Sequence, residues 1–171
     1  MALVLVLSAI AIPQALGTID ALRTIGAARY LSSRLMLTRS MAVQRTAAVA
    51  IRFETDDRGV MFSTYKDGNH NGVRTRDIEL GIDRQIEQPV RLFEQFPGVD
   101  FGLVLDDVSQ DPIQIGNTSL LTFTPIGTAT SGSLYVRGRD GSQYAVRVLG
   151  ATGRTRVQRY DPQQRRWTDE F

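Results

Sequence analysis

The first 46 residues of the chain contain a single proline, and this feature constrains the fold more than any other. Residues 1–12 are apolar except for Ser8, and Pro13 follows them. Proline removes one hydrogen bond from a helix and kinks it, but residues 14–46 contain no other proline and only two glycines. The sequence therefore predicts one long helix over residues 1–46, which is almost wholly apolar at its start.

The predicted helix divides into two parts of different character. Residues 1–19 suit lipid or the core of a filament, because that part is apolar on all sides. Residues 20–46 are amphipathic: one stripe recurs at spacings of three, four and seven, and we expect Arg23, Arg34 and Arg45 on nearly the opposite side. The residues assigned to the membrane or filament are Leu3, Val4, Leu5, Val6, Leu7, Ile10, Ile12 and Pro13. Those assigned to helix–sheet packing are Ala28, Leu31, Leu35 and Ala42.

The apolar run at the start is short. A bilayer needs roughly 20 apolar residues, and a secretory signal peptide begins with a basic region, which residues 1–12 lack. Two interpretations remain open at this point. Either the apolar helix begins upstream of Met1, or the segment is an unusual signal peptide that is cut near Ala11 or Gly17.

After Thr46 the pattern changes from helical to alternating, which is typical of strands. Arg139-Asp140-Gly141 lies between two such segments and indicates a tight hairpin. Residues 73–95 show no clear period. The expected strands cover residues 49–53, 60–65, 99–105, 120–125, 134–137, 144–149 and 154–160. The predicted fold class is α+β, with a long N-terminal helix packed on an antiparallel β domain over residues 47–171.

Composition excludes several functions. The chain has no cysteine, so disulfides, cysteine-based zinc sites and thiol nucleophiles are excluded. His70 is the only histidine and stands in a loop-like segment, and no phosphate-binding, dinucleotide-binding or serine-hydrolase motif occurs. We therefore expect a protein that is not an enzyme.

Charge is segregated along the chain. Residues 1–53 carry six arginines and one acid, residues 54–136 carry six basic residues and thirteen acids, and residues 137–171 carry eight arginines and four acids. Such a pattern favours a surface with oriented partners, although solvated faces would also produce it.

The segment from Asp67 to Gly72 resembles the start of a calcium loop. Oxygen-bearing side chains alternate and a glycine takes the sixth position, but the twelfth position is Ile78, where a carboxylate is required. The candidate ligands are Asp67, Asn69, Asn71 and Asp77. The alternative is a polar hairpin loop without a metal.

Arginines near the C-terminus form a second candidate site. If Val157 points inward, Arg154 and Arg156 share the outer face of a strand, and Arg159 follows them. Arginines beside aromatic residues can bind DNA phosphates and stack bases. The alternative is a solvated edge that protects an exposed strand.

The layout and two short motifs resemble a known family. The apolar helix ends in Ala9-Ile10-Ala11-Ile12-Pro13, and Gly153-Arg154-Thr155-Arg156 follows a strand late in the chain. Together with residues 37–45 at the arginine-bearing helix end, they resemble the GspH/FimT family, which comprises type II secretion pseudopilins of the H class and FimT-like type IV minor pilins. Members of that family carry a short basic leader, an aromatic residue at the cleavage point and an early glutamate. By alignment on Pro13 we expect these features about ten residues upstream of Met1.

The resemblance implies a structural function. It implies a minor subunit of a type II secretion or type IV pilus-like filament, anchored once in the bacterial inner membrane with its globular domain in the periplasm. The implied partners are other pseudopilins or pilins, an inner-membrane assembly platform and the prepilin peptidase. Two alternatives stay open: a DNA-binding minor pilin that uses the C-terminal arginines, and a secreted β-rich binding domain with a cleaved signal peptide.

Overall fold

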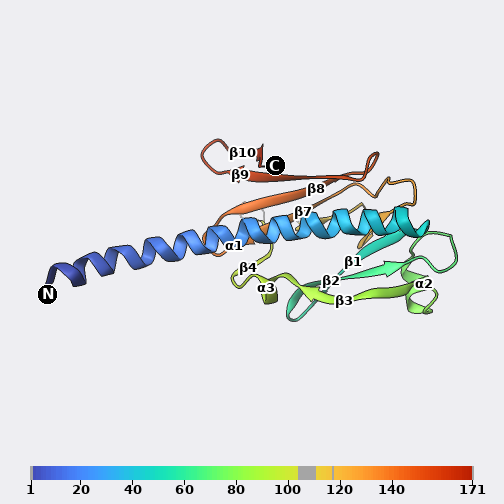
Figure 1. Cartoon of the computed structure of the whole chain (residues 1–171), viewed down its shortest axis with the longest axis horizontal. Coiled ribbons are helices and arrows are strands. Elements are labelled where there is room, and N and C mark those ends of the chain that lie inside the picture. Colours follow the sequence, from blue (N-terminus) through green and yellow to red (C-terminus); the bar gives the residue numbers. More distant parts are fainter. Residues whose placement is uncertain (1, 104–110, 117, 171) are drawn as a thin grey trace.

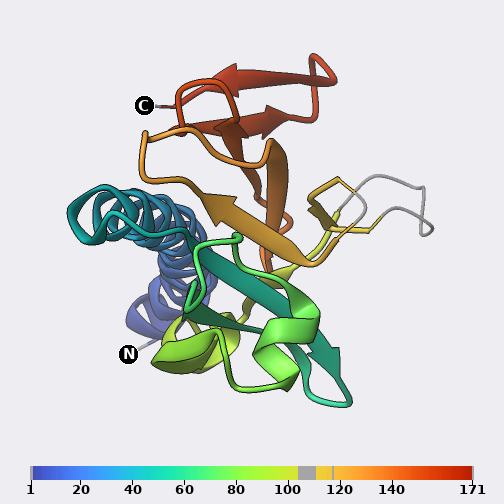
Figure 2. The ribbon, with the colours of Figure 1, turned by 90° about the vertical axis from the view of Figure 1, so that its right-hand side faces the viewer.

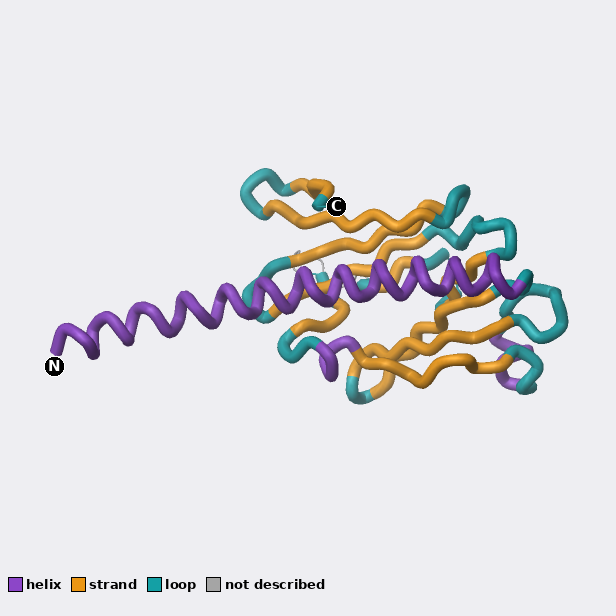
Figure 3. Tube along the Cα trace, viewed as in Figure 1, coloured by secondary structure: helices purple, strands orange, loops and turns teal. Residues whose placement is uncertain are grey.

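A computed structural model describes residues 2–103, 111–116 and 118–170, and for residues 2–16 it describes the backbone alone. Helix α1 (Ala2–Arg45) is a single helix of 44 residues that continues through Pro13. Its C-terminal half lies across the domain and its N-terminal half extends beyond it (Figure 1, Figure 3). The other elements are β1 (Val49–Asp56), β2 (Gly59–Lys66), α2 (Thr75–Glu79), β3 (Arg84–Arg91), α3 (Leu92–Gln95), β4 (Val99–Phe101), β5 (Ile113–Gln114), β6 (Leu120–Phe123), β7 (Gly132–Gly138), β8 (Gln143–Leu149), β9 (Arg154–Asp161) and β10 (Arg166–Asp169).

The strands form two antiparallel sheets. The four-stranded sheet has the order β3-β2-β1-β6, and the six-stranded sheet has the order β10-β9-β8-β7-β4, with β5 also paired to β7. The predicted hairpin at residues 139–141 joins β7 to β8, with Arg137 opposite Gln143. Viewed from the side in Figure 2, α1 runs beside both sheets, which extend away from it. The predicted α+β fold, a long helix on antiparallel sheets, is therefore confirmed.

The buried stripe of α1 is wider and more polar than the sequence indicates. Ala28, Leu31, Leu35 and Ala42 are all buried, and so are Ala27, Thr24, Ser32 and Thr38. The hydroxyls of Thr24 and Thr38 donate to the carbonyls of Asp20 and Arg34 in the preceding turn, at 2.9 and 2.8 Å. These bonds satisfy the hydroxyls inside the helix, so the two threonines can pack like small apolar residues.

Arg34 does not lie opposite this stripe, which corrects the expectation for that arginine. It is on the flank of the stripe and forms an ion pair with Glu87 of β3. The Thr64 hydroxyl donates to the same Glu87 oxygen at 2.5 Å. The ion pair thus connects α1 to the edge strand of the four-stranded sheet.

The six-stranded sheet approaches α1 much more closely. A Cβ on Gly138 would overlap the Thr24 hydroxyl, so only glycine fits at the end of β7. The Ser32 and Thr155 hydroxyls lie 3.1 Å apart and link α1 to β9. Between Thr24 and Ser32, Phe96 packs over Gly26, and its ring centroid is 5.7 Å from that of Tyr30.

Three phenylalanines join the two sheets. Phe53 and Phe62 belong to β1 and β2, and Phe101 belongs to β4 of the other sheet. Their ring centroids are 5.9 to 6.4 Å apart, and Phe101 meets both of the others edge-on. All three are buried in the core that also contains Phe123, Val146 and Val148.

Residues 73–95, expected to be irregular or partly helical, contain α2 and α3, and also the strand β3, which was not expected. The register of β3 with β2 shifts twice between Phe62 and Tyr65. These shifts break the alternation that identifies a strand in a sequence. The strand expected over residues 99–105 ends at Phe101, and residues 104 and 105 lie outside the described part of the chain.

Candidate functional site

The face of α1 turned away from the domain carries exposed apolar side chains. Leu22, Met36 and Val43 are exposed to 64, 53 and 48% and are separated by multiples of seven residues. A spacing of seven places them on one side of a helix. Ile19 and Leu37 are also exposed, at 44 and 45%. This apolar stripe, defined by Leu22, Met36 and Val43, suits packing against another helix.

The N-terminal half of α1 contains Leu3, Val4, Leu5, Val6, Leu7, Ile10, Ile12 and Pro13, and all eight are helical. Their side-chain environment lies outside what the structure describes. In the portion of the chain that is described, no helix has both the length and the apolar character that crossing a membrane requires.

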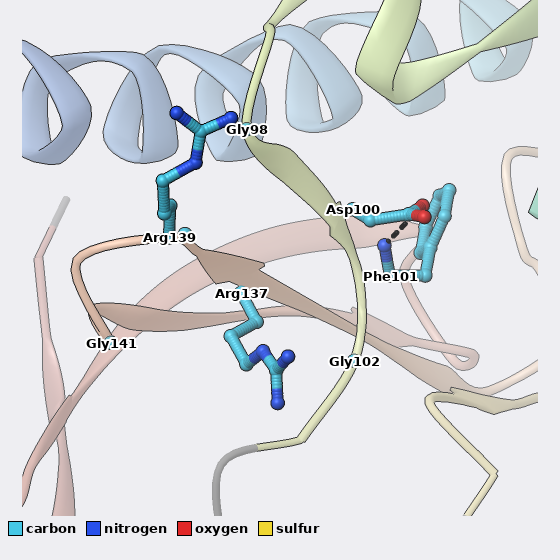
Figure 4. Close-up of a pocket in the computed structure, with 8 residues that line it drawn as sticks. Gly98, Asp100, Phe101, Gly102, Arg137, Arg139 and Gly141 are labelled. Carbon is cyan, nitrogen blue, oxygen red and sulfur yellow. Dashed lines mark hydrogen bonds between the residues drawn. The ribbon is translucent and has the colours of Figure 1, made fainter.

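A cavity of about 620 Å³ lies where β4 meets the β7–β8 turn. Its lining includes four glycines, Asp100, Phe101, Arg137 and Arg139. Figure 4 shows Arg139 beside Gly98, whereas Arg137 points in the opposite direction. The side chains that line it are one carboxylate, two guanidinium groups and one phenyl ring, which makes it a charged recess.

Asp100 lines this cavity with its carboxyl partly buried. Burial raises the pKa of its carboxyl, while the hydrogen bond from the Phe101 N–H and the nearby Arg91 charge act in the opposite direction. The bond from Phe101 measures 2.8 Å and is drawn in Figure 4. The carboxylate also approaches the β1–β2 turn, since a Cβ on Gly59 would lie 3.3 Å from it.

The loop proposed for calcium is held by its own carboxylates. Asp67 is buried, and its two oxygens accept backbone N–H groups of Asn69, His70 and Gly72 at 2.8 to 3.0 Å. Asp77 accepts from the amides of Asn69 and Asn71 at 3.4 and 3.0 Å, so these side chains present N–H groups to it.

Asp83, which the sequence analysis missed, completes this arrangement. It is 2% exposed and accepts from the Gly68 and Arg74 N–H groups at 3.0 and 2.9 Å. Among the described residues there is no group of three or more His, Asp or Glu placed to hold a metal. In this geometry the oxygens of Asp67 and Asp83 accept backbone N–H groups, as in a polar loop, and a calcium ion held by Asp67, Asn69, Asn71 and Asp77 stays a prediction. His70 is exposed in this loop, with φ of 62°.

The three C-terminal arginines do not share one face. Val157 is buried and its neighbour Thr155 contacts α1, so Arg154 and Arg156 point to the outer face of the six-stranded sheet. Arg159 is two residues from Val157 and therefore lies on the same face of β9 as Val157, paired with Tyr144 in the register. Burial raises the pKa of the Tyr144 hydroxyl, and the positive charge of Arg159 acts in the opposite direction.

The outer face brings Arg154 and Arg156 together with a residue that the sequence analysis missed. Arg147 of β8 lies directly opposite Arg156 in the register. All three arginines line a groove of about 720 Å³. The sequence does not indicate that Arg147 belongs to this site, because its position opposite Arg156 follows only from the register of β8 and β9.

A continuous helix that lies across antiparallel sheets with its N-terminal half outside the domain defines a pilin-like subunit. The solved structure of the minor pseudopilin EpsH from the type 2 secretion system of Vibrio cholerae is similar, with a TM-score of 0.53 and 13% identity, covering 82% of this chain and 98% of that one. At this identity the likeness shows the fold. A search of curated proteins found no match.

The model of the family described as type II transport protein GspH matches residues 27–153. This chain belongs to that family, and the solved structure that it resembles is that of a minor pseudopilin. Pseudopilins are structural proteins and not enzymes, in agreement with the absence of a catalytic motif from the sequence.

Proposed function

We propose that this chain is a minor subunit of the type II secretion pseudopilus and acts by assembly. In this proposal the apolar N-terminal part of α1, residues 1–19, holds the chain in the bacterial inner membrane, and the globular domain lies in the periplasm. Other pseudopilins, the inner-membrane assembly platform and the prepilin peptidase are the partners.

The observation that carries this proposal is the division of α1. The half from Thr24 to Ala42 is packed on both sheets, whereas the half before Thr24 extends beyond the domain (Figure 1). A helix that is apolar on all sides is solvated equally well by lipid or by sister helices. The apolar stripe of Leu22, Met36 and Val43 continues this interaction surface alongside the domain.

Cysteine cross-linking in cells tests the assembly. Because the chain contains no cysteine, Leu22→Cys and Met36→Cys each introduce a unique thiol on the exposed stripe. We expect both to form cross-links to another pseudopilin with matching cysteines, and we expect His70→Cys, which lies in an exposed loop far along the chain, to form none. Equal cross-linking from all three positions would contradict the proposed interface.

Membrane extraction tests the anchor separately. A charged residue in the middle of a lipid-embedded helix costs several kcal/mol, so Leu7→Asp should move the chain from the carbonate-resistant membrane fraction to the soluble fraction. Ser33→Asp, on the exposed side of α1 beside the domain, is the matched control and should leave the distribution unchanged. Retention of Leu7→Asp in the membrane fraction would refute the anchor.

A further inference from the structure

Two arginines face each other on the outer side of the six-stranded sheet. Arg147 and Arg156 are direct register partners on β8 and β9, and side chains so placed have Cβ atoms about 5 Å apart. Like charges in this arrangement repel each other and destabilise a sheet. Arg154 lies on the same face, two residues from Arg156.

Aromatic rings hold one of these arginines in place. The Arg147 guanidinium lies 6.0 Å from the Tyr135 ring centroid and 5.8 Å from that of Trp167. Trp167 in turn packs on Tyr135 and Tyr160 at 5.5 and 5.2 Å. Cation–π contacts of this kind fix the guanidinium without neutralising its charge.

Little else in the groove neutralises these charges. The residues lining it include no acid. Arg147 Nε is buried and has no hydrogen-bond partner within the described structure. Asp169 at the rim is 3.6 Å from Arg156, but both side chains are more than half exposed, and exposed pairs of this kind contribute little.

We infer that this groove binds an acidic, extended segment of a protein partner. Carboxylates of the segment would lie between Arg147 and Arg156 and beside Arg154, which relieves the repulsion between the arginines. Ser131, Ser133 and Gln158 also line the groove and supply further polar groups. The inference is independent of the proposed anchor, because the groove is on the face of the sheet that is turned away from α1.

Three observations favour a peptide over a nucleic acid. Leu149 is 60% exposed at the groove and offers contact to an apolar side chain. Tyr135, Tyr160 and Trp167 pack on one another, and Tyr135 is only 8% exposed, so these rings are engaged with each other and with Arg147. Phosphate binding depends on the number of cations along the backbone, and the groove presents three, with Asp169 at its rim.

Fluorescence anisotropy with the purified full-length chain tests the inference. The probe is a short fluorescein-labelled peptide with glutamate at every second position and leucine and threonine between. We expect Arg147→Gln, Arg156→Gln and Arg154→Gln each to weaken binding about tenfold. Arg159→Gln is the matched control, because it removes the same charge from the opposite face of the same strand, and it should leave the dissociation constant unchanged.

The competing outcomes are distinct. Binding of labelled single-stranded or duplex oligonucleotide in preference to the peptide, with the same dependence on the arginines, would overturn the peptide partner in favour of nucleic acid. Absence of binding by every probe, or equal losses from Arg159→Gln and Arg156→Gln, would overturn the site. Arg154 is exposed and makes no side-chain contact among the hydrogen bonds and ion pairs described, so Arg154→Gln remains a valid test if Arg147→Gln fails to fold.

Discussion

The two sheets are attached to the same helix by different means. The six-stranded sheet approaches α1 through small residues, with Gly138 against Thr24 and Ser32 against Thr155. The four-stranded sheet is linked at its edge by the Arg34–Glu87 ion pair. Close packing depends on volume and the ion pair depends on charge, so the two attachments should respond to different substitutions.

The joint between the sheets should show the largest effect. Phe62→Ala removes a ring that contacts Phe53 of its own sheet and Phe101 of the other. Replacing a buried phenylalanine by alanine costs about 4 kcal/mol, and we expect this loss in the free energy of unfolding measured with urea. Ile126→Ala, at a side chain that is 85% exposed, is the control. A loss below 1 kcal/mol for Phe62→Ala would show that the sheets do not depend on this joint.

Disturbing the close packing of the six-stranded sheet against α1 should cause the second-largest loss of stability. Gly138→Ala places a Cβ against the Thr24 hydroxyl and forces α1 away from β7. Overpacking of this kind costs about 2 to 3 kcal/mol, to be measured by thermal and urea unfolding. Gly17→Ala is a control with the opposite sign: it meets no neighbour within 4 Å, and replacing a helical glycine stabilises by about 0.5 to 1 kcal/mol. If Gly138→Ala is neutral, the close approach of α1 is not required.

The ion pair of the four-stranded sheet should have a smaller effect. Glu87→Gln removes the charge that Arg34 pairs with while keeping the shape of the side chain. Both side chains are about one-fifth exposed, so we expect a loss of about 1.5 kcal/mol, without a change in the helix signal by circular dichroism. Glu79→Gln, at an exposed acid, should change nothing. Equal effects of the two substitutions would remove the distinction between the attachments.

Asp100 of β4, which approaches the β1–β2 turn of the other sheet, should have the smallest effect on stability, and this effect should depend on pH. Burial raises the pKa of Asp100, so its ionised form is disfavoured in the folded state. Asp100→Asn should therefore raise the melting temperature at neutral pH, and the difference should disappear once the pH falls below the ordinary pKa of an aspartate carboxyl.

The pKa of Asp56 shifts in the opposite direction to that of Asp100. Its hydrogen bond to Arg91 lowers its pKa, so the stability that it contributes is present at neutral pH and is lost as the pH falls through its folded pKa. Asp56→Asn should consequently lower the melting temperature at neutral pH and have no effect in acid. Melting temperatures that shift in the same direction for Asp100→Asn and Asp56→Asn would contradict the opposite pKa shifts of the two carboxyls.

The sequence predicted the helix and the hairpins because these depend on local signals. The absence of proline after Pro13 and the spacing of Leu31 and Leu35 sufficed for α1, and Asp140-Gly141 sufficed for the β7–β8 turn. It did not predict β3, because two register shifts destroy the alternation of its residues. It also missed Thr24 and Thr38 in the buried stripe, because a polar residue in a helical pattern is expected on the exposed side. The hydrogen bonds of their hydroxyls within the helix, which allow burial, are seen only in the structure.

The candidate sites were harder to predict from the sequence, because they depend on how segments of the chain are placed relative to one another. Oxygen-bearing side chains in the loop after Asp67 suggested a cation, but whether carboxylates receive metal or backbone N–H depends on the path of the loop. Arg154 and Arg156 followed from alternation, whereas the opposition of Arg147 to Arg156 depends on the register of two strands.

The division of α1 also has a mechanical consequence. The packed segment from Thr24 to Ala42 is about 27 Å long and the segment before it about 33 Å, at 1.5 Å per residue. The packed segment is held along its length, from the contact of Thr24 with Gly138 to the Arg34–Glu87 ion pair, so a lateral force on the N-terminal part of the helix acts first on the contacts nearest to Thr24.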